Sequence, residues 1–355
     1  MLGQLKRAVT DGGPGFCQIA LTNACNAACG FCSFARLPKS DWVVPETAEI
    51  ARAIDALHAR GVGYLVFVGG EPLLHPGLYE LIKHARHLGM ASLICTNGSL
   101  LTAENIQRLL AAGLKGVIIS IDAPDEEKHN QNRGIPNLCA RIKEANRLLR
   151  ARGLNPTASV TISRLVGDFG RLPAFVRGLG FGKLTFSYPL NYLGSSYLSY
   201  SSSPLIDFSR GELIEVFGQI IDLKRRFPIL NPRASLQDMI RTLKGEPPHF
   251  ACLAGYKYFF IDWHLDLYRC HYVKKPMCKA ADFARARLIR DGCTACMIDC
   301  YRDPSVLQFC AVAVADGLRA LRAGRWGEAA RRLLDGRNLE SLRSVFEERK
   351  WIGEF

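Results

Sequence analysis

The sequence predicts an α/β protein: a partial (β/α)6 barrel followed by a small, cysteine-rich α+β extension. Three observations support this. From residue 16 to about 187, short apolar runs alternate six times with amphipathic segments. The runs are almost continuously apolar, as in parallel strands that helices cover. Seven of the thirteen cysteines lie between residues 252 and 310. Six βα units are too few to close an eight-stranded barrel, so we expect an open one.

The barrel segment is expected to hold six strands with helices between them. The strands cover Phe16–Leu21, Tyr64–Val68, Ala91–Cys95, Gly116–Ile121, Thr157–Ile162 and Lys183–Ser187. In the helices, apolar residues recur on one face, and glycine follows several of them as a stop. The helices cover Pro45–Arg60, Gly77–Leu88, a segment from the cap Thr102 to the stop Gly113, Leu138–Arg152 and Leu172–Leu179.

Beyond the barrel the sequence changes character. The serine-rich stretch Tyr188–Pro204 predicts a long loop, either a lid or a linker, and a helix is expected over Arg210–Arg226. An apolar run over Lys257–Trp263, a short turn and Asp266–Cys270 predict a β-hairpin. We therefore divide the chain into an N-terminal segment (1–15), the barrel (16–230), the cysteine-rich extension (231–311) and a basic helical tail (312–355).

Composition excludes several classes of protein. Of 355 residues, 48% are hydrophobic and 22% charged, which excludes wholesale disorder. No run of eighteen apolar residues occurs, so we expect no membrane-spanning helix. Lys6 and Arg7 are followed by no apolar stretch, which argues against a secretory signal and for a cytoplasmic protein. The net charge of +13 favours acidic partners or simply a solvated basic surface. No nucleic-acid partner is expected, and the amphipathic tail leaves contact with a membrane surface or an acidic partner open.

Three cysteines lie within eight residues of the loop after the first strand. Cys25, Cys29 and Cys32 form a C-x3-C-x2-C pattern. In a reducing compartment such a cluster indicates metal rather than disulfides. Three thiolates would hold three irons of a [4Fe–4S] cube and leave the fourth iron open to an amine and a carboxylate. A zinc loop is the alternative, but zinc requires a fourth Cys or His, and the nearest histidine, His58, lies in a predicted helix.

This segment resembles the radical SAM superfamily, whose members carry the same spacing with an aromatic residue before the last cysteine, here Phe31. One βα unit later, Gly69-Gly70-Glu71-Pro72 is similar to the family's GGE motif. The resemblance implies a [4Fe–4S] cluster on the three cysteines. It also implies that Gly69, Gly70 and Glu71 receive the amino group of S-adenosylmethionine (SAM), since glycines admit a close backbone approach and a carboxylate pairs with an ammonium.

The resemblance implies further SAM contacts at the ends of the later strands. In any such fold, some strand ends carry polar side chains by coincidence. The residues implied are Thr96 and Asn97 of a TNG turn, Ser120 and Asp122 after the fourth strand, Arg133 in the next loop, Thr161 and Ser187. The implied chemistry is reductive cleavage of SAM to a 5′-deoxyadenosyl radical, which abstracts hydrogen from the substrate.

The second set of cysteines resembles the SPASM/twitch extension of the same superfamily, in which hairpin cysteines and a later CxxC share an auxiliary [4Fe–4S] cluster. One such cluster is expected on Cys252, Cys270, Cys293 and Cys296. The hairpin departs from the family pattern, because Leu265 stands where glycine is usual. The alternatives are a structural zinc site, an exchange of ligands, or a second auxiliary cluster. The cysteines available for these are Cys278, Cys300 and Cys310.

The sequence thus predicts an enzyme that abstracts hydrogen from a small molecule, metabolite or lipid. The first strand begins near residue 16, which leaves no room for an N-terminal peptide-recognition domain. A ribosomal-peptide maturase of the same superfamily is the alternative, and a non-catalytic iron–sulfur or zinc protein is an alternative of another class. A flavodoxin or ferredoxin would suit the basic chain as reductant. No catalytic side chain is identified. The histidines His75, His84, His87 and His129 are expected to be surface or loop residues.

Overall fold

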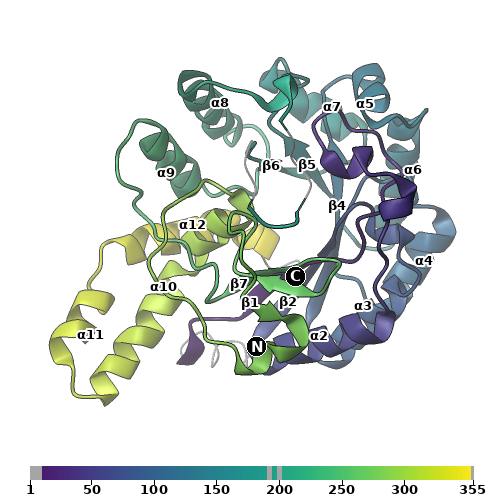
Figure 1. The fold of residues 1–355 in the computed structure, drawn as a ribbon. Coiled ribbons are helices and arrows are strands. Elements are labelled where there is room, and N and C mark those ends of the chain that lie inside the picture. The colour runs from purple at the N-terminus through teal and green to yellow at the C-terminus, as the bar shows by residue number, and fades with distance from the viewer. Residues whose placement is uncertain (1–9, 190–193, 198–201, 353–355) are drawn as a thin grey trace.

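A computed structural model describes residues 10–189, 194–197 and 202–352 (Figure 1). One sheet of nine strands forms its centre. The strands are β1 (Gly15–Ala20), β2 (Val62–Val68), β3 (Ala91–Thr96), β4 (Gly116–Ile121), β5 (Thr157–Thr161), β6 (Lys183–Ser187), β7 (Tyr258–Ile261), β8 (Asp266–Tyr268) and β9 (Cys278–Lys279).

The sheet is parallel through its first six strands, and it is open. Its order is β6-β5-β4-β3-β2-β1-β7-β8-β9, so β6 and β9 are its two edges. The predicted partial barrel of six parallel strands is therefore confirmed. The hairpin β7–β8 joins the same sheet, because β7 pairs in parallel with β1 (Phe16 opposite Tyr258). The cysteine-rich extension thus continues the barrel sheet instead of forming a separate layer.

Helices lie around the outside of the barrel and beside the β7–β9 edge (Figure 1). They are α2 (Thr47–Ala59), α3 (Leu78–His87), α4 (Ala103–Ala112), α5 (Glu126–Arg133), α6 (Leu138–Ala151), α7 (Leu172–Gly178), α8 (Arg210–Leu223), α9 (Arg233–Leu243), α10 (Asp299–Arg322), α11 (Trp326–Leu333) and α12 (Arg337–Ile352). The predicted apolar faces are buried, as Ile50, Ile54 and Leu57 of α2 show. The two lone cysteines Cys17 and Cys139 are buried in the same core.

The strands bury alternate residues to different degrees. On β1 the side chains of Cys17 and Ile19 are fully buried, whereas Gln18 between them is only partly buried. Cys95 on β3 and Ser120 on β4 are partly buried as well. Since successive side chains of a strand point to opposite faces, the fully buried set faces the helices and the partly buried set faces the inside of the open barrel.

The structure differs from the expected layout in three helices. Arg133 closes helix α5 rather than lying in a loop, and helix α9 was not expected. Helix α10 begins at Asp299 and runs across the boundary expected at residue 311, with Pro304 inside it as its sixth residue. The segment 1–9 lies outside the described residues.

Helix α10 is relevant to the expectation that the chain has no membrane-spanning helix. Among the described residues it alone is long and apolar enough, by length and composition, to cross a bilayer. Its residues Tyr301, Arg302 and Ser305 are nevertheless buried in the protein. A core helix of a globular domain meets the same criteria.

Candidate active site

The loop that carries the first cysteine set leaves the carboxyl end of β1. Two polar side chains shape it: the Thr22 hydroxyl donates to the Val43 carbonyl (2.7 Å), and Asn23 exchanges hydrogen bonds with Asp41 and Val43. The backbone N–H of Ala24 donates to Thr22 Oγ1 (3.0 Å). These bonds replace strand pairing beyond Ala20 and hold the loop against the end of the sheet.

The three thiols of this loop influence one another. Burial raises the pKa of Cys29 to about 12 and that of Cys32 to about 11, and it raises the pKa of Cys25; the neighbouring cysteines raise the pKa of Cys29 further. Thiolates form at such a site only when a nearby cation compensates their charge, as iron does. Over the described residues no three Cys, His, Asp or Glu side chains converge closely enough to hold a metal ion. All thirteen cysteines are free thiols.

The Gly69-Gly70-Glu71 turn lies directly against this loop. The N–H of Gly70 donates to the Thr22 carbonyl (2.9 Å), and that of Glu71 donates to the Ala24 carbonyl (2.8 Å). A Cβ at Gly69 would lie 2.3 Å from the Thr22 oxygen, and one at Gly70 would lie 2.0 Å from the Ala24 oxygen. The two glycines therefore allow the chain to pass the cysteine loop at backbone contact, which is a role within the protein itself.

The Glu71 side chain is fully buried and accepts three hydrogen bonds. Oε1 accepts from the Thr96 hydroxyl (2.8 Å) and from the Leu73 N–H (3.2 Å), and Oε2 accepts from the Asn97 N–H (2.8 Å). Burial raises the pKa of Glu71, and the hydrogen bonds from Asn97 and Thr96 oppose that shift. Three residues predicted to contact SAM are thus brought together, with Glu71 joining the ends of β2 and β3.

Two further side chains connect this turn to the cysteine loop. Asn97 Nδ2 donates to Asn26 Oδ1 (2.8 Å), and Asn26 Nδ2 donates to the Ser99 hydroxyl (3.0 Å). The sequence analysis did not select Asn26 or Ser99. Their positions gave a signal, since Asn26 lies between two ligand cysteines and Ser99 directly follows the TNG turn.

Asp122 and Arg133 form a buried bidentate pair beside the cysteine loop. Arg133 donates from Nε (2.7 Å) and Nη2 (2.5 Å) to the two carboxylate oxygens, and Asn132 Nδ2 adds a third bond (2.7 Å). Burial alone would raise the pKa of Asp122, but the charge of Arg133 holds it below its usual value. Helix α5 also reaches the loop itself, because the Ala28 N–H donates to the Arg133 carbonyl (2.8 Å) and the Gly30 N–H donates to Asn132 Oδ1 (3.1 Å).

His129 completes this cluster, and the expectation that it lies on the surface or in a loop is wrong. It is fully buried on α5, where its Nδ1 accepts from the Asp122 N–H (3.2 Å). Burial lowers the pKa of His129 to about 4. His75 is buried too, between the Pro45 carbonyl and the Gly77 N–H. The short polar segment around His129 gave no apolar periodicity from which a buried helix could be predicted.

The other predicted SAM residues line the far side of the barrel. Thr161 and Ser187 stand opposite each other at the ends of β5 and β6. Ser120 lies beside Cys95, and its hydroxyl hydrogen-bonds to that thiol. Among the residues that the structure describes, no hydrogen bond links Thr161, Ser187 or Ser120 to Glu71 or Asp122.

The N-terminus of α10 brings two carboxyl groups to this side, which the sequence analysis did not expect. Asp299 Oδ1 accepts from the Tyr188 N–H (3.2 Å), and Asp303 accepts from Asn231 Nδ2 (2.7 Å) and from the Ser235 hydroxyl. Burial raises the pKa of Asp299 to about 8 and that of Asp303 to about 6. The charge of Asp299 also raises the pKa of the Cys95 thiol, after burial and the charge of Glu71.

The four cysteines predicted for an auxiliary cluster belong to one packed group. Cys252 and Cys270 are buried in it, and Cys293 and Cys296 pack against it. The Cys252 N–H donates to the Cys293 carbonyl (2.8 Å). Burial raises the pKa of Cys296 to about 12, and the other three thiols raise it further. The hairpin and the CxxC segment are therefore neighbours, as the resemblance to the SPASM/twitch extension implies.

The three alternate cysteines lie in different surroundings. Cys278 is on β9 against the main core, and Cys310 is on α10, where its N–H donates to the Ser341 hydroxyl (3.1 Å). Cys300 packs against the second cysteine group from the first turn of α10, and its thiol hydrogen-bonds to Gln18 in the barrel.

An arginine–aspartate pair also braces the second cysteine set. Arg269 donates from Nη1 (2.6 Å) and Nη2 (2.9 Å) to the carboxylate of Asp291, which in turn accepts from the Cys293 N–H (3.2 Å). Leu265 adopts a positive φ of 58° in the hairpin turn. Leu265, which stands where glycine is usual, thus adopts the left-handed backbone conformation that glycine favours.

The serine-rich loop contacts this second region where it is described. Gly194 and Ser195 donate their N–H groups to the His271 carbonyl (both 3.1 Å), and Tyr197 stacks on the His271 ring at 4.0 Å. Ser196 donates to Asp262 (2.5 Å). The remaining residues of the predicted lid or linker at 190–193 and 198–201 lie outside the described residues.

Comparison with known proteins agrees with this geometry. Residues 19–170 match the family model "Radical SAM superfamily". The chain is 31% identical to the AdoMet-dependent heme synthase of Oleidesulfovibrio alaskensis over 162 residues, 45% of this chain and 42% of that protein. It is 30% identical to the PqqA peptide cyclase of Gluconobacter oxydans over 175 residues, 48% of each. The matches therefore span less than half the length of these relatives.

Solved structures with the same fold extend the likeness beyond the matched domain. The anSMEcpe structure with bound AdoMet and the Cp18Cys peptide has a TM-score of 0.56 at 16% identity and covers 92% of this chain and 99% of that chain. Streptococcus suis SuiB bound to the precursor peptide SuiA also has a TM-score of 0.56, at 15% identity over 83% of this chain and 66% of that chain. At such identities the likeness establishes the fold.

Proposed function

Because residues 19–170 of this chain form a radical SAM domain, we propose that the protein cleaves SAM reductively and abstracts hydrogen from an organic substrate. The observation that carries the proposal is the junction at the carboxyl ends of β1 to β4. There the cysteine loop is hydrogen-bonded both to the Gly69–Glu71 turn and to the end of α5. A loop whose cysteines merely bound zinc would not require these contacts to two successive strand ends.

The donor set suits a three-thiolate cluster. Cys25, Cys29 and Cys32 lie on one loop with no histidine among them, and burial leaves their thiols in need of a compensating cation. A [4Fe–4S] cluster held there would, with SAM bound, supply the electron that cleaves SAM to a 5′-deoxyadenosyl radical.

The chain's own residues fix the surroundings of that cluster. Glu71 and Asn97 set the position of the β3 turn, and Asp122 with Arg133 fixes the side of the cysteine loop nearest α5. We assign Gly69, Gly70, Thr96, Ser120, Thr161 and Ser187 to the walls of the SAM site. The aromatic side chains of Phe34, Trp263 and Tyr197 pack edge-to-face beside the loop and would exclude water from the reacting groups.

We further propose that Cys252, Cys270, Cys293 and Cys296 hold one auxiliary [4Fe–4S] cluster. Their common packing and the hydrogen bond between Cys252 and Cys293 support this set over one that includes Cys278 or Cys310. Its role would be to bind substrate or to pass an electron to or from the substrate. An acidic flavodoxin or ferredoxin would serve as reductant, since the chain carries a net charge of +13.

The substrate that we propose first is a small molecule, metabolite or lipid. A peptide is the second candidate, and the relatives favour it: a PqqA peptide cyclase matches in sequence, and two of the similar folds were solved with peptides bound. A polar barrel interior with Gln18, Ser120 and Asp299 would accept a hydrogen-bonding group of either.

Anaerobic reconstitution with iron, sulfide, SAM and dithionite tests the reaction. The expected products are 5′-deoxyadenosine and methionine, absent in Cys29→Ala and retained in Cys139→Ala, which removes a buried thiol that is not a proposed ligand. Formation of neither product by the iron-loaded parent protein would instead favour the non-catalytic iron–sulfur or zinc protein.

Isotope transfer then separates the substrate classes. The reconstituted protein is incubated with metabolite, lipid and peptide fractions from cells grown in deuterated medium. The fraction that adds deuterium to 5′-deoxyadenosine contains the substrate. Deuterium transfer from the peptide fraction alone would overturn our first choice in favour of peptide maturation.

A further inference from the structure

Helices α11 and α12 expose most of the large apolar side chains found on the surface. Among the described residues seven large hydrophobic side chains are exposed, and six of them lie between residues 326 and 346; the seventh is Val44. The six are Trp326 (71% exposed), Leu333 (37%), Leu334 (83%), Leu339 (54%), Leu342 (44%) and Phe346 (63%). We call this set the α11–α12 face. Monomeric proteins rarely expose large apolar patches, so the exposure of these side chains calls for an explanation.

Helix α12 is oriented with its polar side towards the protein. Ser341 and Ser344 are buried, and the Ser341 hydroxyl donates to the Leu307 carbonyl (3.2 Å). Leu339, Leu342 and Phe346 are spaced three and four residues apart, so they share the opposite side of the helix. A surface helix of a globular protein ordinarily buries its apolar side. The reverse orientation indicates that the apolar side has a partner outside the chain.

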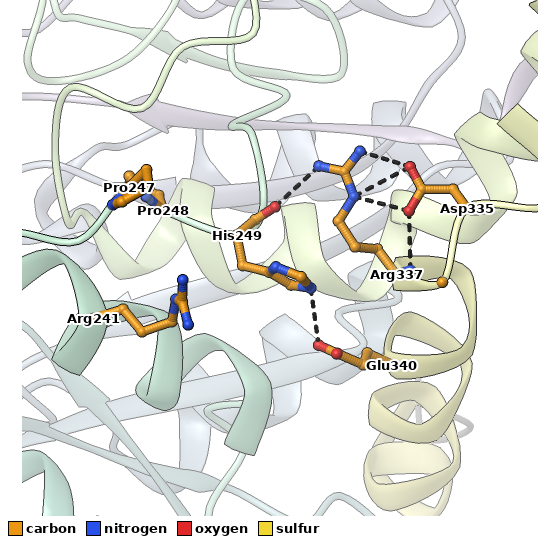
Figure 2. Close-up of a pocket in the computed structure, with 8 residues that line it drawn as sticks. Arg241, Pro247, Pro248, His249, Asp335, Arg337 and Glu340 are labelled. Carbon is orange, nitrogen blue, oxygen red and sulfur yellow. Dashed lines mark hydrogen bonds and ion pairs between the residues drawn. The ribbon is translucent and has the colours of Figure 1, made fainter. Parts of the chain in front are cut away.

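The carboxylates of this region are turned towards the body of the protein. Figure 2 shows Glu340 directed at His249 (3.4 Å) and Asp335 held by Arg337 (2.6 Å), in the pocket between the chain before β7 and α12. Glu348 is buried against Lys224 (2.7 Å). These contacts anchor α12 and pair these carboxylates with basic side chains, while Glu340 stays 47% exposed.

Helices α10, α11 and α12 also carry free cations. Arg322, Arg331 and Arg343 are exposed, and among the described residues none of the three guanidinium groups has a hydrogen-bonding or ion-pair partner. Arg349 lies over the Phe346 ring at 5.8 Å. The face therefore combines tryptophan, leucine and phenylalanine with arginine. This is the composition of helices that lie in the interface of a membrane with anionic lipids.

We propose that the α11–α12 face docks the protein onto the surface of an anionic lipid bilayer. The apolar side chains would enter the boundary between headgroups and acyl chains, and the three free arginines would pair with anionic headgroups. Figure 1 shows α11 at the margin of the molecule opposite α4 and α6, and α12 beside α9 and α10. The proposal concerns binding alone and is independent of SAM cleavage.

Co-sedimentation with vesicles tests this docking. The full chain is expected to sediment with vesicles of phosphatidylcholine and phosphatidylglycerol, and not with phosphatidylcholine alone. Raising the salt concentration should weaken binding, since salt screens the headgroup charge. The triple variant Arg322→Gln/Arg331→Gln/Arg343→Gln should lose about fivefold in affinity for each arginine, about 100-fold in total. Leu342→Ser/Phe346→Ser should abolish sedimentation.

Matched controls keep the test independent of folding. Val44→Ser removes an exposed apolar side chain elsewhere, and Arg52→Gln removes an exposed arginine from α2; both should bind as the parent does. Circular dichroism melting of each variant checks that the helices remain folded. The proposal is overturned if the parent protein does not sediment with anionic vesicles, or if Leu342→Ser/Phe346→Ser binds them with the affinity of the parent. A dimer in sedimentation velocity that Phe346→Ser dissociates, without vesicle binding, would assign the face to self-association instead.

Discussion

Each cysteine region contains a bidentate arginine–aspartate pair, and the two pairs differ in how deeply the aspartate is buried. Beside the first set, Arg133 binds Asp122 with both partners buried: the side chains are 9% and 0% exposed. Beside the second, Arg269 binds Asp291 in the same bidentate manner, but the Asp291 side chain is 51% exposed. A buried pair cannot lose one partner without leaving a charge in the interior, whereas water replaces a partner at the surface. We therefore expect the first region to be rigid and the second to tolerate change.

The largest contrast between the regions should appear in the cysteines themselves. Cys29→Ala removes a ligand to the proposed SAM-binding cluster and should abolish SAM cleavage. Cys270→Ala alters only the proposed auxiliary cluster and should leave uncoupled cleavage while stopping substrate turnover. Liquid chromatography of 5′-deoxyadenosine after anaerobic reconstitution measures both.

Iron content provides the control for this pair. Each variant should lose only the iron of its own cluster. If Cys29→Ala still cleaved SAM at the parent rate, the assignment of the first site would be wrong. Parent-level substrate turnover by Cys270→Ala would remove the second cluster from the reaction.

The two aspartates should differ next. Asp122→Asn leaves the buried Arg133 without a counter-charge and should lower the free energy of unfolding by about 3–5 kcal/mol. Asp291→Asn removes a half-exposed carboxylate but leaves Arg269, whose side chain is only 10% exposed, without its counter-charge, so the loss should be smaller, about 1–3 kcal/mol. Urea denaturation of the apoproteins at neutral pH measures both, and equal losses would contradict the difference in depth.

The barrel was predictable because its signals are local. Each strand is a short apolar run and each covering helix repeats its apolar residues on one face, so six parallel strands followed from the sequence. Helices α5 and α9 were not found. In α5 the sequence from Glu126 to Arg133 is polar throughout, so no apolar periodicity marks it, and only the contacts of His129, Asn132 and Arg133 with the cysteine loop explain its burial.

For the site, the sequence predicted which residues lie close together but not the hydrogen bonds between them. Glu71, Thr96 and Asn97 were chosen as SAM contacts, and the structure adds that they hydrogen-bond mutually. Asp299 could not be found, because only the packing of α10 brings a residue from the extension into the barrel. The hairpin, which returns the chain on itself, explains why Cys252 and Cys270 pack in one group; the auxiliary cluster itself stays a prediction.

The glycines offer a smaller contrast between the regions. A Cβ at Gly70 would meet the Ala24 backbone oxygen at 2.0 Å, whereas one at Gly255 would approach side-chain atoms of Arg269 and Ile289 at 3.1 Å, at a φ of +85°. Gly70→Ala should therefore cost about 3 kcal/mol and displace the cysteine loop, because backbone cannot give way. Gly255→Ala should cost about 1–2 kcal/mol from its positive φ.

Gly218→Ala serves as the control for these substitutions. Gly218 lies within α8 with open space around its Cβ position, so alanine there should raise stability by about 0.5–1 kcal/mol. Thermal denaturation compares the three variants. A Gly70→Ala protein as stable as its parent would show that the close passage of the two loops is not required.

The last expected effect concerns pH and again belongs to the first region. Burial lowers the pKa of His129 to about 4 in the folded protein, against about 6.5 for an unperturbed histidine. The folded state therefore disfavours the protonated ring. The stability that the neutral ring contributes is fully present above pH 6.5, and about 1.4 kcal/mol of it is lost per pH unit as the pH falls towards 4. His129→Asn keeps an acceptor near the Nδ1 position and removes the titration, so its stability should fall less steeply over that range.

Other groups titrate in the same range, so the test is the difference in slope between parent and variant. Urea denaturation at several pH values between 4.5 and 7 provides the slopes, with the exposed His87→Asn of α3 as the matched control. His87→Asn should follow the parent. If His129→Asn followed the parent as well, the pKa of His129 would be the same in the folded and unfolded states, and burial would not disfavour the protonated ring.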